Sequence, residues 1–233
     1  MPRRSVLSAA ERENLLALPD AEDEVIRQYA FSQSDLAMIR QRRGDANRLG
    51  VAAQLCLLRF PGQGLSSEAD VPAALLHWIG GQLGIDTACW PAYAAREETR
   101  REHLLELRTY LGLESFDLAH YRQAVQSATE LALQSDKGIV LAGSVLDALR
   151  CQHVVIPALE VIERICAEAI TRATRNIHAA LTDSLSAEHR HRLDDLLKRR
   201  EEGKSTRLAW LRQSPVKPNS RHMLEHIERL KAW

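Results

Sequence analysis

The spacing of apolar residues constrains the fold of this chain more than any other feature, because almost none of it alternates with the period of a β-strand. Over most of the 233 residues, apolar positions recur three or four apart, as on one face of an amphipathic helix. Val154, Val155 and Ile156 form the one β-branched cluster, which is too short to make a strand. We therefore predict an all-α protein.

Capping and helix-breaking residues set the expected helix ends. Ser8 and Glu11 have the spacing of a capping box, and Ser34 is placed to cap the third helix. The expected helices cover 9–18, 22–29, 35–41, 46–58, 72–84, 93–110, 117–134, 137–150, 157–181, 187–200, 205–212 and 220–233. Breaks near 112–115 and 182–186 predict domains at 1–112, 113–183 and 184–233. The last helix reaches Trp233 without a capping signal, so we expect a longer parent protein.

The composition excludes several classes of protein. With 45% hydrophobic residues the chain can bury one large core or two small ones. The four cysteines are far apart and form no CxxC pair, which argues against a zinc ribbon or a disulfide framework and favours a reducing cytoplasm. The first residues lack the apolar core of a signal peptide, and no run reaches membrane-spanning length. We expect a cytoplasmic protein with no membrane partner.

Positive charge is concentrated in two stretches of a chain whose formal net charge is zero. Residues 36–60 hold five arginines against one acid, Asp45, and from residue 186 onward twelve Lys or Arg face seven acids. The first group precedes and begins an apolar helix, whose N-terminal dipole also favours an anion. Nucleic acid is therefore the first hypothesis, and a solvated helix face is the alternative. The arginines are Arg40, Arg42, Arg43, Arg48 and Arg59.

A second basic segment lies at 93–103. Arg96, Arg100 and His103 fall three or four apart, so one helix face would present two guanidinium groups and an imidazole. Arg101 has Glu97 four residues before it, which favours an ion pair within the helix for that arginine. The side chains that could read adenine by type are Gln41, Asn47 and Gln54.

Catalytic motifs are lacking in the sequence. No nucleophile elbow, P-loop or dinucleotide fingerprint is present. His222, Glu225 and His226 match the H-x-x-E-H pattern of inverted zinc proteases, but a further ligand would have to lie downstream, where seven residues remain. The alternative is an amphipathic helix with polar residues at those positions. We predict no catalytic residue and no metal site in this chain.

Several segments resemble the N-terminal region of the replicative transposases of class II bacterial transposons, the Tn-three family. The resemblance covers essentially the whole chain and is carried by SVLSAAERENLLALP, IRQRRGDANRLGVAAQLCLLRFPG, YAAREETRREHLLELRTYLGL, ELALQSDKGIVLA and LAWLRQSPVKPNSRHMLEHIERL. It implies that helical domains bind the terminal inverted repeats of a transposon. It also implies that the acidic catalytic triad and its divalent metal lie beyond Trp233, so that this part needs no cofactor.

The resemblance and the arginines together predict DNA-binding units of helix-turn-helix type at 1–112 and 113–183. Tyr121, Arg122 and Lys137 are the candidate contacts of the second unit. The expected partners are double-stranded DNA of the transposon ends, the rest of the transposase and, in the full-length protein, a second copy, all in the bacterial cytoplasm at the nucleoid. A helical protein-interaction scaffold is the alternative, based on the leucine stripe Leu193, Leu196 and Leu197.

Overall fold

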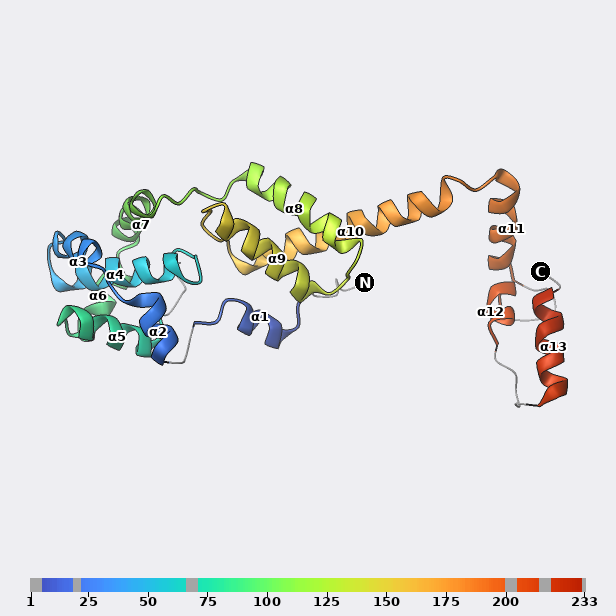
Figure 1. Cartoon of the computed structure of the whole chain (residues 1–233), viewed down its shortest axis with the longest axis horizontal. Helices are drawn as coiled ribbons and strands as arrows, with labels where there is room; N and C mark the ends of the chain where they lie inside the picture. The colour runs from blue at the N-terminus through green and yellow to red at the C-terminus, as the bar shows by residue number, and fades with distance from the viewer. Residues whose placement is uncertain (1–5, 19–21, 66–70, 200–204, 214–218, 232–233) are drawn as a thin grey trace. The chain divides into compact units, whose positions relative to one another are not determined.

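The computed structural model describes residues 6–18, 22–65, 71–199, 205–213 and 219–231 (Figure 1). Within these ranges every regular element is a helix, and β-type pairing is limited to isolated bridges between Glu114 and Val154 and between Arg199 and Thr206. The all-α prediction is confirmed. None of the described helices combines the length and the apolar content that crossing a membrane requires. The chain divides into two compact units, Met1–Thr174 and Arg175–Trp233.

The first hydrophobic core of unit 1 is built around one buried helix, α4. Its residues 49–56 are all buried, because the sequence LGVAAQLC is apolar or small on every side and lets neighbouring helices approach closely. The helices of this part are α2 (Glu22–Tyr29), α3 (Gln33–Arg40), α4 (Asp45–Arg59), α5 (Ala73–Leu83), the 3₁₀ turn η1 (Thr87–Cys89), α6 (Trp90–Ala94) and α7 (Glu97–Leu111). Each of the other helices in this list packs on α4.

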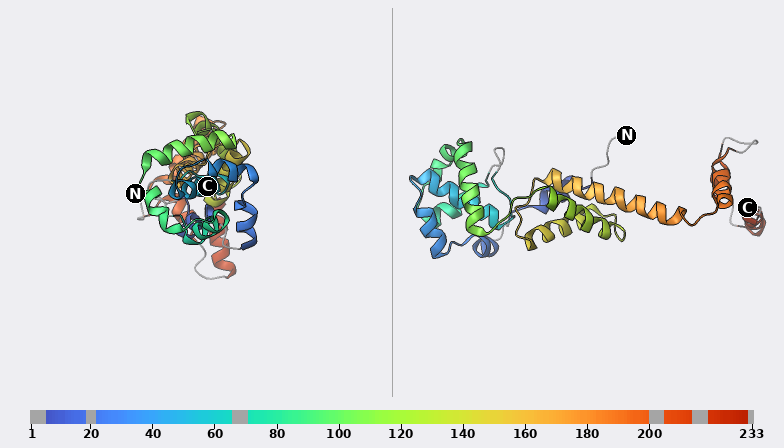
Figure 2. Two further views of the ribbon diagram at one scale, coloured as in Figure 1. Left: turned by 90° about the vertical axis from the view of Figure 1, so that its left-hand side faces the viewer. Right: turned by 90° about the horizontal axis from the view of Figure 1, so that it is seen from above.

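A second core lies between α8 and α9, which pack on each other, and the first part of α10 (Figures 1 and 2). Its helices are α1 (Ala9–Leu15), α8 (Leu118–Ala132), α9 (Gly138–Cys151) and the first part of α10 (Leu159–Thr182). Leu7 is buried in this second core and not in the first. The N-terminal segment therefore packs with α8–α10, although it precedes the first core in sequence. The predicted domain boundaries stay a prediction.

Extended segments connect the two cores. The amide of Val155 donates to the carbonyl of Glu114 at 3.0 Å, and the amide of Ile156 donates to the carbonyl of Gly62 at 2.9 Å. The β-branched cluster of residues 154–156 therefore forms an extended strap between the two cores and not part of a sheet.

Unit 2 contains the end of α10 and three further helices, α11 (Ala187–Leu197), α12 (Arg207–Leu211) and α13 (Ser220–Lys231). Among its described residues only Leu196 and Leu211 are buried hydrophobic side chains.

Most expected helix positions agree with the structure, and two differ. The capping box of Ser8 and Glu11 is present, and α2 has the expected ends. Ser34 was the wrong cap, because Ser32 caps α3 and pairs with Asp35 in a capping box. The expected helix 93–110 is two helices with a break at Ala95 and Arg96.

The break between α6 and α7 follows from how Tyr93 is buried. Its ring lies against Gly50 of α4, and its hydroxyl accepts a hydrogen bond from the amide nitrogen of Gln54. The ring of His103 on α7 stacks on that of Tyr93, with centroids 5.7 Å apart. A single straight helix would have to present both rings to α4 ten residues apart, and the break instead brings them into contact.

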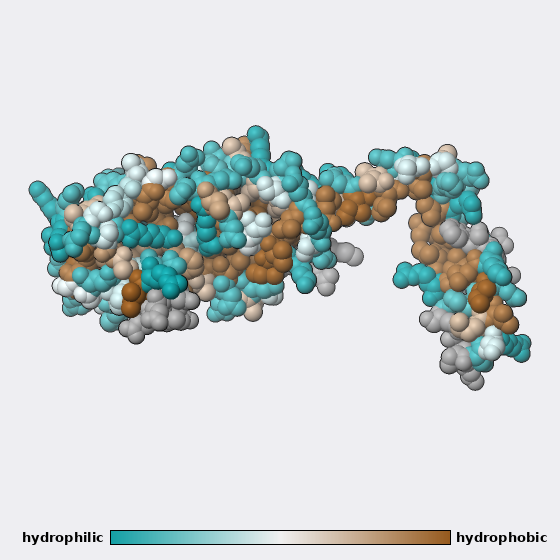
Figure 3. All heavy atoms as spheres, in the orientation of Figure 1, coloured by the Kyte–Doolittle hydropathy of each residue, from teal (hydrophilic) through white to brown (hydrophobic). Residues whose placement is uncertain are grey.

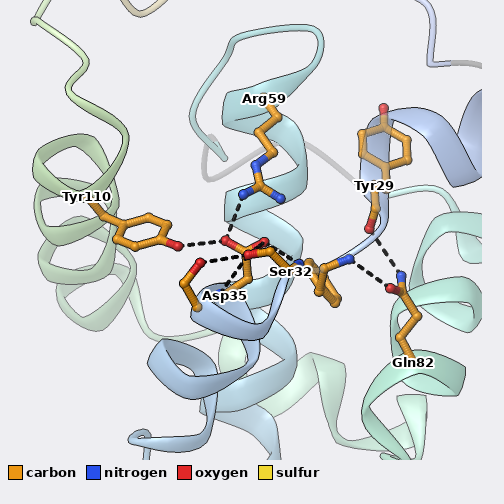
Figure 4. Close-up of polar contacts among 8 residues, drawn as sticks. Tyr29, Ser32, Asp35, Arg59, Gln82 and Tyr110 are labelled. Atoms are coloured by element: carbon orange, nitrogen blue, oxygen red, sulfur yellow. Dashed lines mark hydrogen bonds and ion pairs between the residues drawn. The ribbon is translucent and has the colours of Figure 1, made fainter.

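Asp35 joins three helices through one fully buried carboxylate (Figure 4). Its Oδ2 accepts from the amide and the hydroxyl of Ser32, at 2.7 and 2.8 Å. Its Oδ1 accepts from Arg59 of α4 at 2.7 Å and from the hydroxyl of Tyr110 of α7 at 2.8 Å. Burial by itself raises the pKa of this carboxyl, but the hydrogen bonds from Ser32, Arg59 and Tyr110 together lower it below its usual value.

Replacing Asp35 by Asn should destabilise the protein by about 2–4 kcal/mol, because the Arg59 guanidinium loses its buried partner. The lowered pKa means that the carboxylate stabilises the fold above about pH 4 and that this contribution is lost as the pH falls through the folded-state pKa. Urea unfolding at pH 7 and at acid pH should therefore show a larger gap between wild type and variant at pH 7.

Asp147→Asn is the matched control for this charge removal. Its carboxylate is 76% exposed and lies 3.4 Å from Arg150. We expect a change of within about 0.5 kcal/mol. An equal loss of unfolding free energy in the two variants would contradict a stabilising role of the buried Asp35 network.

Replacing Gly50 by Ala should also destabilise unit 1, because the added methyl group would overlap the Tyr93 ring. Overpacking of this kind costs about 1–3 kcal/mol. Gly81 of α5 has open space beside it, so Gly81→Ala should instead raise the melting temperature through helix propensity. Thermal unfolding of both variants tests the pair, and a neutral Gly50→Ala would contradict the packing described.

Candidate nucleic-acid interface

The turn between α3 and α4 is the best candidate for contact with a polyanion. It spans residues 41–44, and Gly44 is the N-cap of α4 with a φ of 80°. A left-handed φ of this kind favours glycine. Because glycine has no side chain, the cap gives no hydrogen bond to the first-turn amides of α4. These amides and the helix dipole together present positive potential at this end of α4.

One exposed arginine precedes this turn and another lies in it. Within the part of the chain that the structure describes, the side chains of Arg40 and Arg43 make no hydrogen bond or ion pair. Arg48 is 38% exposed, and its guanidinium group already has two partners. Its Nε donates to the carbonyl of Arg42 at 3.0 Å, and its Nη1 lies 3.3 Å from Asp45. Part of the arginine group of residues 36–60 is therefore exposed to solvent at the N-terminus of α4.

The other two arginines of the group are held by acids from distant helices. Arg42 is 23% exposed and lies 2.6 Å from Glu106 of α7. Arg59 is 27% exposed and is paired with Asp35. Their guanidinium groups tie α4 and the turn to the fold, so they are less available to a ligand than Arg40 and Arg43.

A hollow of about 380 Å³ lies beside the turn. Its lining combines polar and apolar residues. Its lining residues are Ile39, Arg40, Asp45, Arg48, Leu83, Gly84 and Ile85. Both cations of the hollow come from the sequence group that we predicted to face phosphate.

The expected exposed face of Arg96, Arg100 and His103 was wrong for two of its three residues. Arg100 is 8% exposed and His103 is 7% exposed, and only Arg96, the N-cap of α7, lies in solvent. Burial lowers the pKa of His103, and the nearby Arg42 lowers it further, so the imidazole favours its neutral form. The reason for the error is that this face of α7 packs on α4.

Gln54, which by residue type could read adenine, is not accessible to DNA. It is fully buried, and its amide nitrogen donates to the Tyr93 hydroxyl and to the carbonyl of Arg100. Asn47 is half-buried and donates to the carbonyl of Arg43 at 3.0 Å. Gln41 is exposed.

The candidates in the second core have different surroundings. The Tyr121 hydroxyl donates to Glu168 of α10 at 2.7 Å, and burial raises its pKa. Arg122 of α8 and Lys137, the N-cap of α9, are exposed, and their charged groups have no partner among the residues described.

The H-x-x-E-H segment lies on α13. His222 contacts Asn219 through Nδ1 at 2.8 Å, and Glu225 lies 3.3 Å from Arg221. Across the described ranges no three His, Cys, Asp or Glu side chains are grouped so that they could hold a metal ion.

The acidic residues that pair with Arg42 and Arg59 were not identified from the sequence. Glu106 and Asp35 lie 64 and 24 residues from their partners. Helical spacing relates residues three or four apart, so it carries no signal for such pairs.

Comparison with known proteins gives a family and several relatives. A family described as "Domain of unknown function (DUF4158)" matches residues 6–169. The chain is 62% identical over all 233 residues to the transposase for transposon Tn3926 of Escherichia coli and 61% identical to that for Tn21 of the same species. It is 54% identical to the transposase for Tn501 of Pseudomonas aeruginosa. Each match covers the whole chain and 24% of the relative, so the chain spans about a quarter of their length.

The resemblance to Tn-three-family transposases that the sequence indicates is thereby confirmed. The chain belongs to the DUF4158 family and corresponds to one quarter of the length of Tn-three-family transposases.

Proposed function

We propose that this chain is a DNA-binding part of a transposase that recognises the terminal inverted repeats of a transposon and so positions a catalytic domain elsewhere in the polypeptide. The relatives are transposases by name, which makes duplex DNA the natural polyanion. The catalytic acids and their divalent metal would lie outside this chain, and the protein would act in the bacterial cytoplasm. The proposal assigns no catalytic residue and no cofactor to the 233 residues.

The observation that carries the proposal is the exposure of Arg40 and Arg43 beside the N-terminus of α4. Arginine is the side chain best suited to a phosphate, because its planar fork donates two parallel hydrogen bonds. A helix N-terminus with free amides adds a second kind of donor to the same place. Contacts of this type set the register of a protein on DNA without reading its sequence.

The burial of α4 limits how the turn can meet DNA. In a helix-turn-helix protein the second helix lies in the major groove and reads bases along one face. Residues 49–56 of α4 are buried on all sides, so at this end of the helix only the first turn, from Asp45 to Arg48, can reach a duplex. We therefore propose that the α3–α4 turn grips the phosphate backbone and that base reading comes from other exposed side chains, with Arg96 and Gln41 as candidates.

Replacing both Arg40 and Arg43 by Ala should weaken binding to inverted-repeat and unrelated duplexes alike. The slope of log affinity against log salt should flatten by about 0.9 for each lost phosphate contact, or about 1.8 for the pair. Fluorescence anisotropy at several salt concentrations measures both quantities.

Arg101→Ala is the control for that experiment, because Arg101 is equally cationic, 77% exposed and paired with Glu97. Its affinity and salt slope should match wild type. If the double variant also matches wild type, the turn does not contact DNA.

Arg96 and Arg100 lie four residues apart and should behave differently. Arg100→Ala should cost about 1–3 kcal/mol of unfolding free energy, because it removes a buried side chain, and should leave the preference for inverted-repeat DNA intact. Arg96→Ala should leave stability unchanged and reduce that preference by about 1–3 kcal/mol, the worth of one base contact. Urea unfolding and competition binding on the same two proteins decide the assignment. A loss of preference in Arg100→Ala without loss of stability would contradict it.

A further inference from the structure

Unit 2 leaves most of its large apolar side chains in water. Only Leu196 and Leu211 are buried among its described residues, whereas large apolar side chains on α10, α11 and α13 are at least 41% exposed. Figure 3 shows brown, hydrophobic atoms at the surface along these helices. Single exposed apolar side chains are ordinary, but a contiguous set marks a surface that binds protein.

The clearest such surface is one face of α13. Met223, Leu224, Ile227 and Leu230 are between 41% and 59% exposed, and their spacing places them on a single side of the helix. The opposite side carries Arg221 and Glu225, which are paired with each other at 3.3 Å. We refer to the four apolar residues as the α13 face.

A helix of this length needs cover for its apolar side. α13 has 12 residues, and isolated helices shorter than roughly 12–15 residues are marginal in water. Packing of the amphipathic face supplies most of the stability of such helices in proteins. None of the other described helices makes more than a slight contact with α13.

The charge of unit 2 argues against a second copy as that cover. Residues 175–233 hold thirteen Lys or Arg and eight acids, so two copies of this unit would repel each other. An apolar surface with an acidic rim complements it instead.

The comparisons indicate where such a surface comes from. The DUF4158 match ends at residue 169, just before unit 2, while the relatives match through all 233 residues. About three quarters of each relative lies outside this match, since the chain covers 24% of it. Unit 2 is thus outside the family domain and is shared with longer transposases.

We propose that the α13 face docks on an apolar, acid-rimmed surface supplied by the part of the transposase polypeptide that lies outside these 233 residues. The four apolar side chains enter that surface, and the cations of unit 2 meet its rim. In this arrangement unit 2 is the joint between the proposed DNA-binding unit and the rest of the enzyme. The docking does not depend on DNA binding by unit 1.

Hydrogen exchange tests the proposal on two proteins, the chain alone and a chimera in which it replaces the matching quarter of the Tn21 transposase. The α13 amides should exchange within seconds in the chain alone at any concentration, and roughly 100-fold more slowly in the chimera. Intact Tn21 transposase, measured over its matching segment, gives the same comparison if the chimera does not fold.

Two matched double variants of the chimera separate the α13 face from the rest of the helix. Leu224→Gln with Ile227→Gln should abolish the protection of α13, whereas Arg221→Gln with Glu225→Gln should keep it. DNA affinity of the chain alone, measured in parallel, should be the same for both, so that failure of the DNA-binding proposal shows separately.

Three results would overturn the docking proposal. Fast exchange of α13 in both proteins would mean that nothing covers it. Slow exchange in the chain alone would mean that unit 2 covers itself. Protection that grows with the concentration of the chain alone would identify a second copy as the occupant.

Discussion

The buried carboxylate of Asp35 is the interaction on which the first core depends, because a charge out of water must be neutralised and hydrogen-bonded where it lies. Its partners come from the cap of α3, the last turn of α4 and the last turn of α7. The orientation of α3 relative to α4 follows from this arrangement, and so does the position of the exposed turn between them.

The five arginines of residues 36–60 show how packing gives identical side chains different roles. Arg59 and Arg42 meet acids on other helices and hold the scaffold, while Arg40 and Arg43 have no such partner among the described residues and face water. The paired arginines fix the ends of α4, and the exposed ones use the geometry that results. A concentration of positive charge in a sequence is therefore a mixture of structural and ligand-facing groups, and only tertiary contacts separate them.

Local features of the fold could be predicted from the sequence, and features that depend on distant contacts could not. The helical class, the capping box of Ser8 and the ends of α2 follow from residues a few positions apart. The cap of α3 is also a local feature, because Ser32 and Asp35 three residues later form a capping box that the sequence analysis overlooked in favour of Ser34. The burial of Arg100 and His103 depends on a break that Tyr93 makes by packing against Gly50. The arginine-rich segment could be located from the sequence because charge density is a local property, but its exposed members could not be told from its paired ones.

The strap formed by residues 154–156 has a consequence for how unit 1 responds to load. The amides of Val155 and Ile156 donate to the carbonyls of Glu114 and Gly62, which leave the first core at two separate points of the chain. Rotation of one core away from the other would have to break these hydrogen bonds. The strap thus couples the orientation of the second core to that of the first, which carries the α3–α4 turn.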